Sequence, residues 1–474
     1  MQGETGDFAQ GSVAGNILRL ALPMTFAQLV NVLYNMVDRM YLGHLPGDTA
    51  NMLAGVGLTF PVLLAVTAFS NLFGAGGAPL FSMARGRGDT QEARCILGTS
   101  FTLLLLTGVA LPVFCYLVRQ PLLYLLGASD LTYPYAEQYL NIYLTGSIFM
   151  MIGLGLNPFI NAQGFARTGM MTVLLGAVAN IILDPLLIFG AGMGVRGAAL
   201  ATVISQLLSA VWAMRFLRGE KALIRLERRW MGLPGKIVLR ITRLGFANFV
   251  MTFTNCIAQA VCNTVLQQFG GELYVSVMTI LSSVREVSIT PANSLTNAGQ
   301  PVLSFNYGAG HYKRVRQGIF WVTLLCVGYT TVMWLVILLF PRQIAALFTT
   351  SETIIAASVP TMQVYFAGIF LMALQMAGQC ATVALGRARQ AIFFSLLRKA
   401  FIIIPLTLWL PHVAGLGVYG VFLAEPISNV IGGVACYVVM LLTIGRELSR
   451  KEKARVAAKA PSASPLPGPG QLLD

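Results

Sequence analysis

The sequence predicts an all-α membrane protein in which twelve transmembrane helices form two pseudo-symmetric lobes of six helices each. Of the 474 residues, 56% are hydrophobic and only 11% are charged, and a water-soluble domain of this length cannot bury that much apolar surface in one core. Apolar runs recur from Ile17 to Ile444, each long enough to cross about 30 Å of hydrocarbon. An internal repeat divides these runs into two equal sets.

The predicted spans are separated by short loops that carry Gly, Pro and basic residues. They cover residues 17–43, 53–84, 94–118, 133–160, 168–190, 196–217, 240–268, 273–306, 315–340, 355–385, 391–411 and 416–444. We accordingly predict an N-lobe at 1–220, a basic cytoplasmic linker at 221–239 and a C-lobe at 240–445. Residues 446–474 are basic and then rich in Pro, Ala, Ser and Gly, which predicts a disordered cytoplasmic tail.

The positive charge follows the topology and is not gathered on one soluble module. The formal net charge is +14, and the basic residues concentrate in alternate loops, most densely between Arg215 and Arg243. This distribution argues against nucleic acid as a partner. Because cytoplasmic loops carry an excess of Lys and Arg, we predict a multi-pass protein of the lipid bilayer with both termini in the cytoplasm.

No cluster of residues predicts catalysis, a cofactor or a disulfide framework. The seven cysteines lie mostly within apolar runs without a CxxC pair, and His44, His311 and His412 stand in separate loops. No combination of His, Asp and Ser supports chemistry on a substrate, so we do not expect an enzyme. Sodium, as a coupling ion, is the one metal ion that the sequence leads us to consider.

The repeat is visible when the chain is compared with itself at an offset of 222 residues. That offset pairs Pro79 with Pro301, Ser82 with Ser304, Gly86 with Gly308, Tyr143 with Tyr365, Gly146 with Gly368 and Gly164 with Gly386. Because six spans is an even number, both halves insert with the same orientation and form a parallel repeat. We therefore predict a pseudo-two-fold axis along the membrane normal and a cleft between the lobes, an arrangement that suits alternating access.

Four acidic residues, Asp38, Asp184, Glu286 and Glu425, lie inside apolar spans. A charged group at the centre of a membrane helix costs on the order of 3 kcal/mol, so it normally faces a cavity or a partner and marks an ion or substrate path. Asp38 ends a polar stripe whose spacings of three and four residues place its members on one helix face. The stripe consists of Gln28, Asn31, Asn35 and Asp38.

The acidic residues of the N-lobe predict a site for a coupling ion. Two carboxylates in one poorly solvated site repel each other, which favours uptake of a proton. The same oxygens suit sodium, because hard cations prefer carboxylate, amide and hydroxyl oxygens, and Asp38, Asn180, Asp184 and Thr202 supply that set. The alternative is that Asp38 pairs with Arg39 at the interface and that Asp184 caps a helix.

The C-lobe repeats the stripe without its acid. At an offset of 224 the stripe corresponds to Thr252, Asn255, Gln259 and Cys262. We therefore expect ion coupling in the N-lobe and hydrogen bonding to a substrate in the C-lobe. Flexible and aromatic groups that tolerate varied ligands complete the candidate cavity, although each such residue alone is more often a part of ordinary packing. The candidates are Tyr34, Met36, Asn255, Gln259, Met372, Gln375, Met376 and Gln379.

Further charged residues within the C-lobe spans predict an intramembrane charge network of Arg285, Glu286, Arg398 and Glu425. Opposite charges in hydrocarbon usually pair, so a structural network is the default, and a direct role with substrate or proton is the alternative. In the first span, Pro23 removes a backbone hydrogen bond and predicts a bend in the helix that carries Asp38.

Several segments of the chain resemble the MATE (multidrug and toxic compound extrusion) family, in particular its DinF-like and MepA-like bacterial branches. The segments are LRLALP at 18–23, YNMVDRMYLG at 34–43, NIILDP at 180–185, GVRGAALAT at 194–202 and SVRE at 283–286. The resemblance covers nearly the whole chain and implies the MATE/MOP-type fold. It also implies export of cationic or amphipathic small molecules in exchange for protons or sodium, from the bacterial plasma (inner) membrane, by a protein that we expect to be a monomer.

The resemblance also assigns positions. It carries the family's N-lobe cation site over to Asp38, Asn180, Asp184 and Thr202, and its bending first helix to the one with Pro23. Some branches bear an acidic C-lobe site on spans 7 and 10. This chain offers Asn255, Gln259, Gln375 and Gln379 there, which puts a C-lobe sodium site in doubt.

The main alternative function is a flippase for lipid-linked oligosaccharides or peptidoglycan precursors, since such proteins look like MATE proteins. A flippase for pyrophosphate-bearing lipids should place several Arg or Lys in its central cavity. Spans 1, 2 and 7 hold almost none beyond their ends, so the sequence favours the exporter.

Overall fold

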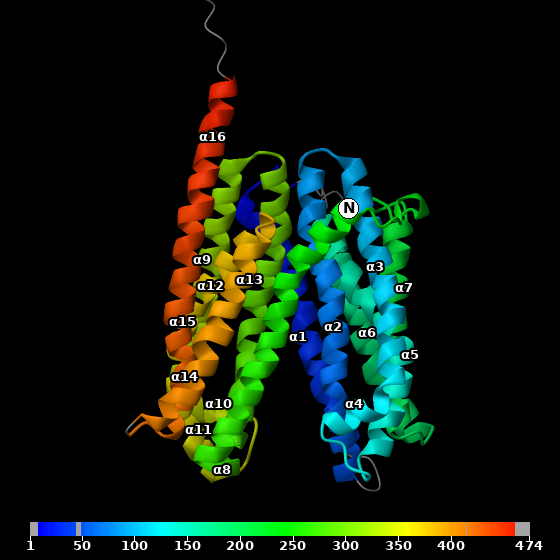
Figure 1. Cartoon of the computed structure of the whole chain (residues 1–474), viewed down its shortest axis with the longest axis vertical. Coiled ribbons are helices and arrows are strands. Elements are labelled where there is room, and N and C mark those ends of the chain that lie inside the picture. Colours follow the sequence, from blue (N-terminus) through cyan, green and yellow to red (C-terminus); the bar gives the residue numbers. More distant parts are fainter. Residues whose placement is uncertain (1–7, 44–48, 414, 460–474) are drawn as a thin grey trace, which may run out of the picture.

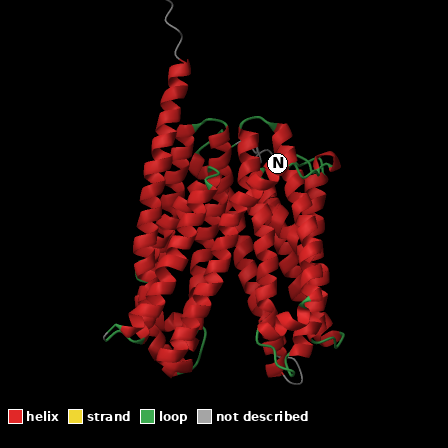
Figure 2. Ribbon diagram, viewed as in Figure 1, coloured by secondary structure: helices red, strands yellow, loops and turns green. Residues whose placement is uncertain are grey.

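The structure, a computed structural model, describes residues 8–43, 49–413 and 415–459. Within these ranges it does not describe the side chains of residues 35, 36, 38–40, 42, 43, 49–51, 53, 54 and 456–459. The described residues form helices joined by short loops, with no strand among them (Figure 2). The all-α prediction is therefore confirmed.

The N-lobe contains six membrane-spanning helices and one short helix. They are α1 (Val13–Gly43), α2 (Thr49–Gly86), α3 (Thr90–Leu117), the short α4 (Arg119–Leu125), α5 (Tyr133–Ala162), α6 (Ala166–Pro185) and α7 (Val195–Arg218). A π-helical turn, Leu186–Gly190, extends α6 after Pro185. An ordered connection with a 3₁₀ turn at Arg228–Trp230 leads to the C-lobe.

The C-lobe begins with α8 (Gly235–Gly308), which at 74 residues is far too long for one span. Gly271 divides it, because its φ of 65° is a left-handed conformation that favours glycine. The chain runs down one limb of α8 and returns up the other (Figure 1). The remaining helices are α9 (Tyr312–Leu339), α10 (Pro341–Ala346), α11 (Glu352–Tyr365), α12 (Ile369–Ala384), α13 (Ala388–Leu396), α14 (Ile404–Trp409), α15 (Val418–Met440) and α16 (Arg446–Lys459).

The predicted number of spans is confirmed once α8 is counted as two. Helices α11 and α12 form one span with a 50° bend, and α13 joins α14 through a π-helical segment, Leu397–Ile403. The described chain then has twelve apolar spans, six in each lobe. The short helices α4 and α10 follow the third span of each lobe at equivalent positions. The loops before α7 and α15 also match, since Gly194 and Gly417 both have positive φ.

The two lobes meet at the end of the bundle where α16 and the loop between α8 and α9 lie, and their ribbons separate toward the other end (Figure 1). At the joined end the backbones approach closely. A side chain at Gly86 would collide with the carbonyl of Phe305, and one at Gly308 with the carbonyl of Met83. Both pairs obey the offset of 222, so this contact has the pseudo-two-fold symmetry that the repeat predicts.

The first helix of each lobe is anchored to the opposite lobe. The start of α1 packs into the C-lobe core through Ile17 and Leu20, and the start of α8 packs into the N-lobe core through Ile241. Arg314 donates hydrogen bonds to the carbonyls of Phe8, Gln10 and Gly11. Its repeat equivalent, Glu92, accepts from Arg240 at 2.7 Å. These packing contacts and hydrogen bonds hold the lobes together at this end.

The structure differs from the sequence prediction at two places in the C-lobe. The predicted tenth span, 355–385, is bent at Gly368, whose φ is 80°, whereas its equivalent Gly146 lies within the continuous α5. The tail was predicted to be disordered from 446, and this is wrong for 446–459, which form α16. There Leu448 is fully buried and Glu447 accepts from the Tyr307 hydroxyl at 2.8 Å. Residues 460–474 lie outside the described part.

Candidate functional site

Among the described residues, a cavity lies within each lobe, and the two cavities differ greatly in volume. The C-lobe cavity has a volume of about 400 Å³ and lies among both limbs of α8, α12, the α13–α14 span and α15. The N-lobe cavity has a volume of about 40 Å³ and lies among α1, α5, α6 and α7. Because drug-sized ligands occupy pockets of about 300 to 1,000 Å³, the C-lobe cavity is the candidate for a substrate.

The N-lobe cavity brings together several residues from the predicted coupling site and polar stripe. Asn31, Tyr34, Asn180 and Thr202 all line it. Sequence reasoning did not select Asn157, Thr172, Ser205 and Ser209, which also line it. A signal was available for the two serines, because they follow Thr202 at spacings of three and four residues and so share one helix face. The cavity wall is therefore rich in amide and hydroxyl oxygens.

Asp184 lies next to this cavity in the N-lobe core. It is fully buried, and its Oδ1 accepts a hydrogen bond of 3.2 Å from Asn180 Nδ2, one helical turn away. Asn180 is 2% exposed, and its Oδ1 has no hydrogen-bond partner among the described residues. A buried carboxylate thus stands beside a free amide oxygen, which is a suitable beginning for a cation site.

The remaining predicted residues of the first span are not all placed. Gln28 is exposed and lies outside the linings of both cavities. The side chains of Asn35, Met36 and Asp38 lie outside the described part of α1. Pro23 lies inside α1, which is continuous from Val13 to Gly43. The participation of Asp38 in coupling and the bend at Pro23 remain predictions.

The uncharged residues selected for a substrate cavity in the C-lobe all line the C-lobe cavity. They are Asn255, Gln259, Met372, Gln375, Met376 and Gln379. Gln379 Nε2 donates to Ser395 Oγ at 2.6 Å, and Gln259 Nε2 donates to Asn263 Oδ1 at 3.2 Å. Tyr34, in contrast, belongs to the N-lobe cavity. The C-lobe cavity therefore combines amide groups with methionine side chains.

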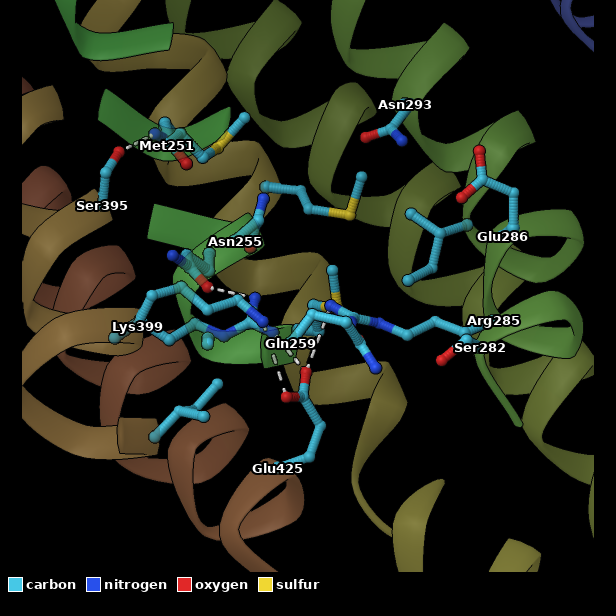
Figure 3. Close-up of a pocket in the computed structure, with 18 of the residues that line it drawn as sticks. Met251, Asn255, Gln259, Ser282, Arg285, Glu286, Asn293, Ser395, Lys399 and Glu425 are labelled. Carbon is cyan, nitrogen blue, oxygen red and sulfur yellow. Dashed lines mark hydrogen bonds and ion pairs between the residues drawn. The ribbon is translucent and has the colours of Figure 1, made fainter. Parts of the chain in front are cut away.

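Four charged side chains form one network in the wall of the C-lobe cavity (Figure 3). Glu425 Oε1 accepts a hydrogen bond of 2.5 Å from Arg398 and lies 3.3 Å from Arg285. Its Oε2 lies 3.5 Å from Lys399 Nζ. Arg398 also donates to Gln375 Oε1 at 2.7 Å. The second limb of α8, the π-helical segment and α15 thus meet through these side chains.

Glu286 does not join this network, although the sequence placed it there. It lines the cavity, but its carboxylate points away from Glu425 (Figure 3). The reason is helix geometry, because successive residues of a helix point about 100° apart and Arg285 already faces Glu425. Lys399, which the predicted network does not include, takes part instead. The position of Lys399 next to Arg398 in the sequence is the feature from which its participation could have been predicted.

The charged network occupies positions that hold small residues in the N-lobe. At the offset of 222, Gly153 corresponds to Gln375, Gly176 to Arg398 and Ala177 to Lys399, and at 223, Thr202 corresponds to Glu425. All eight residues line their respective cavities. The repeat therefore places one pocket in each lobe at equivalent positions and gives each a different chemistry.

Comparison with known proteins gives relatives over almost the whole length. The multidrug export protein MepA of Staphylococcus saprophyticus is 24% identical over 436 residues, which cover 91% of this chain and 95% of the relative. An FAD transporter of Shewanella oneidensis is 23% identical, over 90% of this chain and 95% of the relative.

Solved structures show the same fold, and a family model matches both lobes. A structure described as the outward-facing conformation of a multidrug resistance MATE family transporter of the MOP superfamily matches with a TM-score of 0.89. At 23% identity, the match covers 96% of this chain and 100% of that one. The family model described as MatE matches residues 23–186 and 246–409, one stretch in each lobe. Since these stretches make up more than half of the chain, the protein belongs to the MatE family.

Proposed function

We propose that the protein is a secondary active exporter of amphipathic small molecules that works by alternating access and is driven by protons or sodium. The observation that carries this proposal is the pair of equivalent cavities in two lobes, of which one has a cation-type oxygen set and the other has the volume of a drug-sized ligand. The relatives support it, since MepA is described as a multidrug export protein.

The proposed orientation follows from the basic loops. The ordered connection between α7 and α8, with Arg225, Arg228 and Arg229, lies at the end where the lobes are joined. Cytoplasmic loops carry excess Lys and Arg, so we assign this end to the cytoplasm of a bacterial inner membrane. On this assignment, the close contacts at Gly86 and Gly308 close the cytoplasmic side, as expected for an outward-facing state.

The proposed coupling site is the N-lobe cluster around Asp184. The buried carboxylate, the free Oδ1 of Asn180 and the hydroxyl of Thr202 offer the oxygen ligands that sodium prefers, and the carboxylate can instead take a proton. The sequence adds Asp38 to this set. We propose no enzymatic activity, and we expect the transporter to act as a monomer.

A flippase for lipid-linked anionic precursors is the second candidate, and one observation favours it. The sequence argues against this class because spans 1, 2 and 7 hold few basic residues. In the structure, Arg285, Arg398 and Lys399 reach the cavity from spans 8 and 11 instead. The basic wall also fits the cationic substrates expected from the sequence less well than neutral or anionic ones.

Transport by purified protein in liposomes tests the proposal. With an imposed proton or sodium gradient, we expect efflux of an amphipathic dye, and we expect Asp184→Asn to lower the gradient-driven rate at least about tenfold, because the variant loses the buried charge that binds the ion. Glu352→Gln, which removes an exposed carboxylate outside both cavities, is the matched control and should keep the rate. Normal ion-driven efflux by Asp184→Asn would exclude Asp184 as the coupling residue.

A labelled lipid-linked sugar in the same liposomes separates the two candidates. The exporter moves the dye under a gradient and leaves the lipid in its leaflet, whereas a flippase translocates the lipid. Absence of movement of either probe under both gradients would contradict the proposed function.

A further inference from the structure

We propose that the C-lobe cavity binds the anionic group of an amphipathic substrate, a carboxylate or a phosphate, between Arg285, Arg398 and Lys399. This inference rests on the proposed function, whose substrate class it specifies. It depends on four features of the cavity: its charge balance, its free donors, its uncharged equivalent in the N-lobe and its apolar wall.

The charge balance of the cavity wall is positive. Three basic side chains surround Glu425. Among the described residues, no other carboxylate forms an ion pair with them within 4 Å. Arg398 and Lys399 are 4% and 7% exposed. Glu286 is a second carboxylate in the cavity wall, outside the network. Buried charges in a membrane protein require opposite charge nearby, and two carboxylates cannot balance three cations. An anionic ligand group supplies the missing charge.

The basic side chains also retain donors that Glu425 does not use. The Nε of Arg398 is buried and has no hydrogen-bond partner among the described residues. Lys399 lies 3.5 Å from Glu425 as an ion pair, and its ammonium group carries three N–H donors, more than a single carboxylate oxygen at that distance uses. Arginine forks bind carboxylate and phosphate oxygens in pairs, and lysine adds a compact charge. The unused donors therefore match an oxyanion.

A purely structural ion-pair network is the alternative, and the N-lobe argues against it. The equivalent positions there are Gly176, Ala177 and Thr202, so the repeated scaffold packs without any charge at this place. Gly432, whose Cβ would lie 3.3 Å from Arg398 Cβ, takes the place of Ser209 in the N-lobe and leaves room for the arginine. A network that served packing alone would need neither the excess of cations nor a cavity of about 400 Å³.

The rest of the wall suits the apolar part of such a substrate. Ile289, Met372, Met376 and Val421 line the same cavity as the basic cluster. Methionine side chains adapt to ligands of different shape. Figure 3 shows Arg285 and Lys399 entering the cavity from opposite sides, so that a charged head group would lie between them and an apolar body would extend along the wall.

Equilibrium binding to the purified full-length protein in nanodiscs tests this inference. The probes share one fluorescent apolar body and differ only in the head group, which is a phosphate, a neutral alcohol or a trimethylammonium group. We expect the phosphate probe to bind at least about tenfold more tightly than the alcohol, and the ammonium probe to bind more weakly than both, because charge-assisted hydrogen bonds are the strongest contacts available. Tightest binding of the ammonium probe would overturn the proposal.

Substitutions with opposite effects separate recognition of charge from damage to the fold. Lys399→Ala introduces the residue type of its N-lobe equivalent, Ala177. This variant and Arg285→Gln should each lower the affinity for the phosphate probe about tenfold or more. Lys399→Arg should keep its affinity. Glu425→Gln should strengthen binding, because Glu425 competes with the ligand for the same donors. Arg342→Gln, which removes an exposed charge outside the cavity, should leave the affinity for the phosphate probe unchanged. Unchanged phosphate affinity in Lys399→Ala would contradict the site.

The lipid composition of the nanodiscs identifies the source of the anion. If phosphatidylglycerol weakens binding of the phosphate probe relative to phosphatidylcholine, the site takes a lipid head group, and if it does not, the site takes a soluble anion. Both results retain the anion site. Binding requires no gradient, so anion binding without transport would contradict only the proposed function, and transport without anion preference only this inference.

Discussion

The N-lobe and C-lobe cavities occupy equivalent positions of one repeated scaffold and yet differ in size and charge. The N-lobe cavity measures about 40 Å³ and is lined by amides and hydroxyls beside the buried Asp184. The C-lobe cavity measures about 400 Å³ and carries three basic groups around Glu425. The backbone of the repeat therefore determines where a pocket forms, and a few side chains determine what it can bind.

The largest stability difference between the lobes should appear at the equivalent pair Glu425 and Thr202. Glu425→Ala leaves buried Arg398 and Lys399 without their carboxylate, and removal of one partner of a buried ion pair typically costs about 3–5 kcal/mol. Among the described residues, Thr202 makes one side-chain hydrogen bond, which is intrahelical and goes to the carbonyl of Ala198, so Thr202→Ala should cost less than about 1 kcal/mol. Thermal unfolding in detergent compares the two variants, and equal losses would refute the asymmetry.

A smaller effect is expected where glycine makes room for the C-lobe network. Gly432→Val places a side chain against the stem of Arg398, and such overpacking typically costs about 1–3 kcal/mol. Gly328→Val on α9 is the control, because no atom lies within 4 Å of an added Cβ there. We expect a lower unfolding midpoint and weaker phosphate binding for the first variant only. If both variants behave alike, Gly432 has no special role in positioning Arg398.

The smallest effect is expected at the short helices that repeat each other, α4 and α10. Arg119 pairs with Glu137 at 2.9 Å and stacks on Tyr116, with its side chain 30% exposed. Arg342 pairs with Glu352 at 2.6 Å, but both side chains are about two-thirds exposed. Exposed ion pairs contribute about 0–1 kcal/mol, so Arg119→Gln should lower the unfolding midpoint slightly more than Arg342→Gln. A larger drop in the unfolding midpoint for Arg342→Gln would show that burial does not determine the relative contributions of these ion pairs to stability.

Much of the fold was predictable from local features of the sequence. The apolar runs predicted the spans, because any segment that crosses hydrocarbon must be long, apolar and helical. The bend at Gly368 was not predictable from composition, since its equivalent Gly146 lies in a continuous helix. Helix α16 was missed because its Pro-rich continuation dominated the composition, although the spacing of Glu447 and Lys451 favours a helix.

The candidate sites were predictable in part. Spacing along one helix identified Asn180 with Asp184, and Asn255 with Gln259, because residues four apart share a helix face. The basic character of the C-lobe cavity was not apparent, since the cations come from spans 8 and 11 while the prediction considered spans 1, 2 and 7. Glu286 was assigned to the network from its neighbour Arg285, but neighbouring residues on a helix face different directions.

The sequence by itself determined the class of the protein, the number of its spans and its division into two halves, because these depend on hydrophobicity and on repetition along the chain. Only the tertiary structure decided which charges share a cavity. Arg285 and Glu425 lie 3.3 Å apart although far apart in the sequence, and their contact depends on how α8 and α15 are rotated and packed. Helix rotation is set by packing against several neighbours at once, and this information is distributed over the whole chain.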